Sequence, residues 1–205
     1  FLSAASHPEE LVIRSKQLGL EAIALCDRDG LYGSPRMHLA GQNHEQRVLV
    51  GAELTLQRPE PLPYNRFPYP SVALLAQDHD GYRSLCRLIT RAHAHHEKGQ
   101  AGIDMTDIAA QRSGLLALVP VDPHAPLTDQ EMSVLTEAFG NDAAVVVWRH
   151  LDATDSPRMA HAQAVSLQYE LPIVASARPR YHDKSRHALC DVMQCIRDGT
   201  TLHAA

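Results

Sequence analysis

Two carboxylates stand where strands of an α/β fold bring functional groups together. Asp27 follows the apolar run 21–26 (EAIALC), and Glu53 lies inside the run 47–56 (RVLVGAELTL). Functional side chains gather at the carboxyl ends of strands in such folds. A metal-assisted hydrolase needs several histidine and carboxylate ligands at one point, so two acids make only weak metal candidates. The simpler interpretation is a turn residue for Asp27 and an arginine partner for Glu53.

Arginines follow two of the later apolar runs. Arg149 comes after 143–147, and Arg178 and Arg180 come after 172–175. Guanidinium groups keep their charge and repel metal cations, so this edge of the fold is a poor place for an ion. Arg178, Arg180, Lys184 and Arg186 form a basic stretch that either meets DNA phosphates or is a solvated loop; we favour the loop.

The 13 histidines invite a metal interpretation, above all His93, His95 and His96. On a helix His93 and His96 share a face, whereas His95 points elsewhere. The stretch ends beside Glu97, Lys98 and Gly99, so we expect a solvated helix surface. Glycine-rich phosphate loops and nucleophile elbows are absent from the sequence.

Short apolar runs alternate with amphipathic segments along the chain. Ser6 and Glu9 have capping-box spacing before a helix that ends near Gly19. Further helices are expected at 35–45, 78–96, 128–139, 156–169 and 185–197, and strands at 21–26, 47–56, 71–76, 115–119, 143–147 and 172–175. This alternation predicts parallel strands with helical crossovers, in either a barrel or an open doubly wound sheet. Residues 58–70 hold five prolines and are expected to form a loop or arm.

The bulk properties fit a soluble globular domain. The 205 residues carry a net charge of −5, which argues against a face that grips duplex DNA. Cysteines at 26, 86, 190 and 195 lack metal-ribbon spacing, so we expect reduced thiols and a cytoplasmic location. We expect neither a membrane-spanning run nor a signal peptide.

Several segments together carry a specific resemblance. They are ASHPEELV (5–12), CDRDGLYG (26–33), VGAELTL (50–56), LLAQDHDGYRSLCRLITRAH (74–93) and CDVMQCIRDGTTL (190–202). In order and spacing they resemble the PHP (polymerase and histidinol phosphatase) domain that opens bacterial error-prone C-family DNA polymerases, which are DNA polymerase III alpha-like. The likeness covers the chain as one domain, 1–205, whose helix near 185–205 leads toward the polymerase palm.

The resemblance implies a distorted seven-stranded βα barrel, similar to a TIM barrel, whose first strand precedes Phe1. Intact members hold a trinuclear metal site, and we match its ligand positions to Ser3, Asp27, Arg28, Glu53, Ser71, Arg178 and Arg180. Only Asp27 and Glu53 keep a ligand side chain, so the site is interpreted as vestigial. We expect Arg178 or Arg180 to pair with Asp27 or Glu53 in place of metal.

Three functions follow as hypotheses. The first is a catalytically silent scaffold or interaction domain of a translesion polymerase, whose parent chain uses Mg²⁺, accessory translesion subunits and the sliding clamp, while other domains contact DNA. The second is a working metal-dependent phosphoesterase or 3′–5′ proofreading exonuclease. The third is a free-standing binding protein that shares the fold.

Overall fold

The computed structural model describes residues 4–58, 69–122, 125–151 and 153–203. It divides into two compact units, which are treated separately below. The first unit comprises Phe1–Leu25, Tyr32–Val48 and Arg178–Ala205, and the second comprises Cys26–Leu31 and Leu49–Ala177. The single domain expected over 1–205 stays a prediction, and most of the proline-rich segment 58–70 lies outside the described residues.

The fold is mixed α/β, with one six-stranded sheet in sequential order, β1 to β6. The strands are β1 (Ala22–Arg28), β2 (Arg47–Thr55), β3 (Ser71–Ala76), β4 (Leu115–Pro120), β5 (Ala143–Val147) and β6 (Ile173–Ala175). A doubly wound open sheet reverses its strand order at a switch point. The sequential order therefore favours the barrel type of winding over the open sheet.

The expectation of an all-parallel sheet is wrong at β3. This strand runs antiparallel to both β2 and β4, whereas β4, β5 and β6 are parallel. Two helices connect β3 to β4, namely α3 (His79–His93) and the short α4 (Met105–Ala110), which the sequence pattern did not predict. Between them Ile103 forms a bridge with Leu56, just beyond the end of β2. The chain thus runs along the sheet and back again between the two strands. Because β4 begins at the edge of the sheet where β3 ends, β4 is antiparallel to β3.

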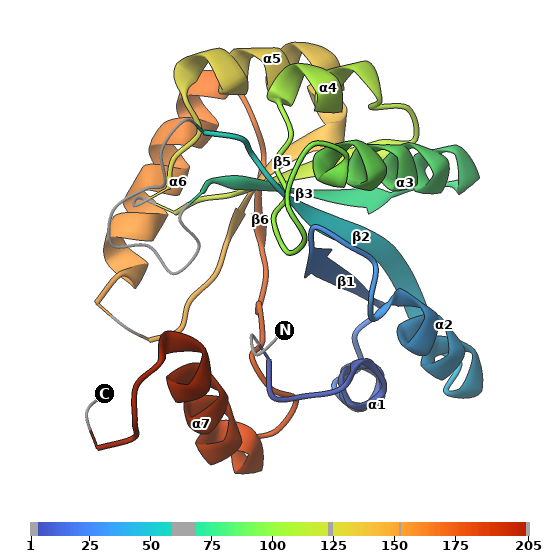
Figure 1. Ribbon diagram of the computed structural model, residues 1–205, viewed down its shortest axis with the longest axis vertical. Helices are drawn as coiled ribbons and strands as arrows, with labels where there is room; N and C mark the ends of the chain where they lie inside the picture. Colours follow the sequence, from blue (N-terminus) through green and yellow to red (C-terminus); the bar gives the residue numbers. More distant parts are fainter. Residues whose placement is uncertain (1–3, 59–68, 123–124, 152, 204–205) are drawn as a thin grey trace. The chain divides into compact units, whose positions relative to one another are not determined.

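One face of the sheet in the second unit carries the apolar core. Alternate residues of the strands, among them Leu54, Val72, Leu74, Ala117 and Val145, are buried against α3, α4, α5 (Asp129–Phe139) and α6 (Asp155–Tyr169). Figure 1 shows these helices around the strands of this unit. Because strand side chains alternate between faces, Glu53, Thr55 and Ser71 belong to the opposite face. The core thus orients the polar face on which the candidate site lies.

The first unit is built on α1 (Pro8–Gln17), α2 (Ser34–Asn43) and α7 (His187–Asp198). Its small core consists of buried Val12, Met37 and Ala40 with partly buried neighbours on β1 and β2. The helix α7 confirms the helix expected near the C-terminus of the chain.

The capping box of α1 lies one residue later than expected. Glu10 accepts a hydrogen bond from the His7 backbone N–H at 2.8 Å, so His7 rather than Ser6 is the N-cap residue. The Ser6 hydroxyl instead lies 2.8 Å from His182 Nδ1 and accepts the His182 backbone N–H. A distant partner thus takes the side chain that local spacing assigned to the cap.

Among the described residues, none of the helices has both the length and the apolar content to cross a bilayer.

Candidate functional site at one edge of the sheet

The strand register defines the edge on which the candidate site lies. Thr55, at the end of β2, pairs with Ser71 at the start of β3. The ends of β4, β5 and β6 lie at the same edge, because β4 is antiparallel to β3 and parallel to the last two strands. Asp78 at the other end of β3 accepts the Gly81 backbone N–H and caps α3. The polar groups of β2 and β3 therefore meet at one edge, away from the Asp78 cap.

Three of the predicted site residues converge there: Arg28, Glu53 and Ser71. The Ser71 hydroxyl donates to Glu53 Oε1 at 2.6 Å, and Arg28 Nη1 donates to the same oxygen at 3.3 Å. Arg28 Nη2 donates to the carbonyl oxygen of Tyr69 at 3.1 Å. One guanidinium group thus joins β1, β2 and the residues that lead into β3.

Asp29 and Thr55 complete the polar network. Arg28 Nε donates to Thr55 Oγ1 at 3.0 Å, and that hydroxyl donates to Asp29 Oδ2 at 2.6 Å. The Thr55 backbone N–H donates to Asp29 Oδ1 at 2.7 Å. Asp29 has a φ of +51°, a backbone conformation that these side-chain bonds stabilise. Two carboxylates thus flank the single guanidinium.

The network combines one guanidinium with two carboxylates, and its side chains are largely withdrawn from water. The side chains of Arg28, Asp29 and Glu53 are 21%, 16% and 14% exposed. A divalent cation placed about 4 Å from the guanidinium would meet a repulsion on the order of several kcal/mol from that group, opposed by the attraction of Asp29 and Glu53. The described residues contain no group of three or more histidine, cysteine or acidic side chains suited to hold a metal ion. Chemically, the arrangement is an ion-pair clamp between strands.

The other predicted site residues are placed differently. Asp27 is half-buried inside β1 rather than in a loop, and strand alternation puts its side chain on the face opposite to that of Arg28. Arg178 and Arg180 belong to the first unit, where Arg180 Nη1 donates to Gln194 Oε1 at 3.4 Å. Their pairing with Asp27 or Glu53 stays a prediction. Ser3 lies outside the described residues.

The expectation of a solvated histidine surface holds for His95 alone. His95 is exposed, but His93 and His96 are half-buried. The helix ends at His93 and the chain folds back, with the Gly102 backbone N–H donating to Ala92 O. His93 Nε2 lies 2.8 Å from the carbonyl oxygen of Asp29, so this ring contacts and stabilises the backbone of a residue in the network. A contact so distant in sequence leaves no local signal.

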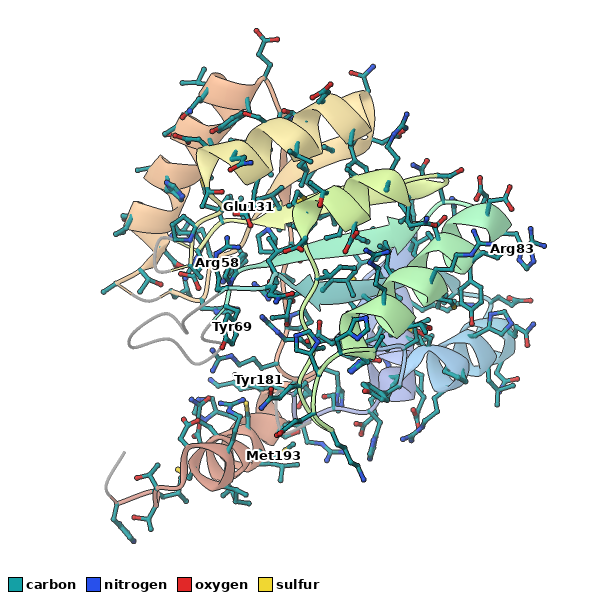
Figure 2. The ribbon with its side chains drawn as sticks, turned by 45° about the horizontal axis from the view of Figure 1, so that its top comes forward. Arg58, Tyr69, Arg83, Glu131, Tyr181 and Met193 are labelled. Carbon is teal, nitrogen blue, oxygen red and sulfur yellow. The ribbon has the colours of Figure 1, made fainter. Side chains whose placement is uncertain are left out.

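A second ion pair holds the chain where the proline-rich segment begins. Arg58 Nη1 and Nη2 donate to Glu131 Oε1 and Oε2, both at 2.5 Å. Figure 2 labels the two side chains. Glu131 also accepts the backbone N–H of Thr128 in the capping box of α5. At the far end of the segment, Arg28 binds the carbonyl oxygen of Tyr69. Residues 58 and 69 are thus each fixed by a guanidinium group.

Removing the Glu131 charge should weaken the fold in a pH-dependent way. Burial raises the pKa of Glu131, but hydrogen bonds from Arg58 and Thr128 outweigh burial and hold the pKa below its ordinary value. A lowered folded-state pKa contributes stability above the unfolded value and loses it as pH falls through the folded value. We expect Glu131→Gln to lower the free energy of unfolding by about 1–2 kcal/mol at pH 7. In urea unfolding series this difference should shrink below roughly pH 4, whereas exposed Glu137→Gln should change little at any pH.

A pocket of about 90 Å³ lies beyond the end of β4, between α5 and α6. Asp122, His161 and Tyr169 are among its lining residues. The Tyr169 hydroxyl donates to Asp129 at 2.8 Å, which ties the two helices together. Ligand pockets usually measure several hundred Å³, so this pocket is small for a ligand site.

The comparisons with known proteins agree with this fold. Residues 1–147 match the family model described as PHP domain. The chain belongs to the PHP domain family. Curated relatives include the error-prone DNA polymerases of Anaeromyxobacter dehalogenans, 37% identical over 100% of this chain, and Pseudomonas aeruginosa, 32% identical over 97%. The chain spans only 18% of the length of each of these two relatives.

Solved structures show the same fold at low sequence identity. A protein of Bifidobacterium adolescentis, named for metal-dependent phosphoesterase activity, matches 90% of this chain and 85% of its own, with a TM-score of 0.58 and 14% identity. An amidohydrolase from Chromobacterium violaceum matches 87% of this chain and 84% of its own, with a TM-score of 0.56 and 11% identity. Identities this low establish the fold and leave the chemistry open.

Proposed function

We propose that this chain is the PHP domain of a bacterial error-prone translesion DNA polymerase and serves there as a catalytically silent scaffold. The observation that carries the proposal is the guanidinium of Arg28, bound to Glu53 at 3.3 Å. By the resemblance above, both residues occupy ligand positions of the metal site in intact members. The positive charge of Arg28 at one ligand position pairs with the carboxylate of Glu53 at another. The guanidinium thus links the strands as a metal cation would, but it cannot act as a Lewis acid.

The hydroxyl at a third ligand position supports the same proposal. Ser71 takes the place of an expected histidine and donates to the oxygen of Glu53 that also faces Arg28. A carboxylate oxygen with two such donors is stabilised as an anion. The clamp therefore holds together strand ends that metal ions hold in intact members.

The seven-stranded barrel is part of the proposal. β6 pairs with β5, and its Ile173 and Val174 are 40% and 42% exposed. Apolar side chains on a terminal strand of the sheet are expected to be covered by a further element. The first strand that the resemblance implies would supply this cover in the parent chain.

The activity of the parent follows from the same membership. We propose that the longer chain extends DNA past lesions in the cytoplasm, with Mg²⁺, accessory translesion subunits and the sliding clamp, and that other domains contact the DNA. The relatives that support this are named error-prone DNA polymerase, and each is several times longer than the matched region.

Hydrolysis assays separate the silent scaffold from a working phosphoesterase or exonuclease. The purified chain is incubated with Mn²⁺, Zn²⁺ or Mg²⁺ and either bis(p-nitrophenyl) phosphate or a primer with a mismatched 3′ end. We expect turnover no faster than that of Glu53→Gln or of buffer, beside primer extension by the longer parent protein. Metal-dependent cleavage that Glu53→Gln abolishes would establish the phosphoesterase instead.

A further inference from the structure

The helix α7 turns an apolar stripe toward solvent. Leu189, Val192 and Ile196 recur at helical spacing, so they form one stripe, and they are 42%, 39% and 62% exposed. The polar side chains of the helix are engaged with one another: His187 lies 3.1 Å from Asp191, and Gln194 donates to Asp198 at 2.9 Å. An amphipathic helix normally packs its apolar side against other apolar groups. The stripe on α7 has no such packing partner in the apolar cores of the described residues.

The first unit does not use this stripe in its own core. That core comprises Val12, Met37 and Ala40 with neighbours on β1 and β2, and none of its members comes from α7. Of the fourteen large apolar side chains that are exposed in the described part of the chain, nine belong to this unit, although it is the smaller one. The stripe on α7 is contiguous by its helical spacing, and contiguous exposed apolar patches mark sites of protein interaction.

We propose that the stripe of Leu189, Val192 and Ile196 is the docking surface for the polypeptide that follows this region in the longer polymerase chain. The inference rests on the proposed function. The matched relatives carry most of their length outside the region that this chain covers, which provides a partner in the same molecule. The apolar character continues past α7, because Leu202 is 56% exposed.

The chemistry of the stripe favours a polypeptide over nucleic acid. Anchors at i, i+3 and i+7 are those that a helix lays into an apolar groove of a protein partner. Asp191 and Asp198 pair with His187 at 3.1 Å and Arg197 at 3.2 Å on the same helix. With its charges paired in this way, α7 itself lacks the excess of basic groups that binding to phosphates needs. The partner is therefore an apolar groove of a polypeptide.

Hydrogen exchange and paired variants test the docking. Deuterium uptake of 187–198 is compared between the 205-residue chain and the longer parent polymerase. We expect at least tenfold slower exchange in the parent, and loss of that protection in Val192→Glu/Ile196→Glu. The matched control is Leu167→Glu, since Leu167 is 83% exposed on α6 in the second unit, and it should leave the protection intact. Both variants should leave the thermal midpoint of the 205-residue chain within about 2 °C of the original.

The possible outcomes separate this inference from the proposed function. Equal exchange in the 205-residue chain and in a parent that extends primers would overturn the docking alone. A gene that continues into no polymerase would overturn both proposals. Light scattering that shows a dimer of the 205-residue chain, made monomeric by Val192→Glu/Ile196→Glu, would assign the stripe to a second copy and reject the docking.

Discussion

Replacing Glu53 by alanine is expected to lower the free energy of unfolding by about 2–3 kcal/mol at pH 7. The change removes the carboxylate nearest to Arg28 and leaves a guanidinium that is only 21% exposed beside fewer acceptors. It also removes the acceptor of the Ser71 hydroxyl. Urea unfolding monitored by circular dichroism measures the loss.

A double-mutant cycle shows whether the loss arises from the pair. Arg28→Ala and Glu53→Ala are made singly and together, and the coupling energy should exceed 1 kcal/mol. Glu137→Ala serves as the control, because this exposed glutamate on α5 should change stability by less than about 0.5 kcal/mol. Strict additivity of the two single changes would show that Arg28 and Glu53 do not stabilise one another.

Gly81→Ala is expected to destabilise the second unit by about 3 kcal/mol. An alanine normally stabilises a helix relative to glycine, by about 1 kcal/mol. Here a Cβ on Gly81 would lie 1.9 Å from the carbonyl oxygen of Gly114 and 2.6 Å from its carbon. Both are backbone atoms, so relief of the clash requires α3 to move away from the turn before β4.

The site of this contact makes the measurement informative. Gly114 has a φ of +67°, and the Gln77 backbone N–H donates to its carbonyl oxygen at 2.9 Å. Thermal unfolding of Gly81→Ala is compared with that of Arg83→Ala, an exposed position on the same helix, labelled in Figure 2. Arg83→Ala should change the midpoint little. A midpoint for Gly81→Ala at or above that of the original chain would show that the close approach is not maintained in solution.

Helices and strands could be located from the sequence because each encodes its own period. The apolar run 71–76 became β3, and the stripe within 78–96 became α3. The direction of β3 could not be read in the same way, since a strand buried on one face has the same pattern in either direction. The direction of β4 relative to β3 depends in turn on α4, a helix of six residues that is too short to show a period.

From the sequence, only those site residues that lie on the same face of one strand could be predicted to be close together. Glu53 and Thr55 share a face of β2, so their proximity follows from the sequence alone. Ser71 joins them because β2 and β3 pair in antiparallel register, and Tyr69 contributes a backbone carbonyl that no side-chain motif reveals. The structure gives Glu53 an arginine partner on the neighbouring strand, Arg28, which the sequence pattern did not single out for this role, while the pairing with Arg178 or Arg180 stays a prediction. Local pattern thus identifies candidates, and non-local pairing decides which of them meet.

Metal content measured by mass spectrometry, after dialysis against Zn²⁺ and Mn²⁺, tests the central claim most directly. If the Arg28 guanidinium has replaced the ions of the ancestral site, the purified chain should bind far less than one equivalent of either metal. Glu53→Gln should bind the same small amount. One or more equivalents of metal in the original chain, lost in Glu53→Gln and accompanied by phosphoester cleavage that a chelator stops, would contradict the account.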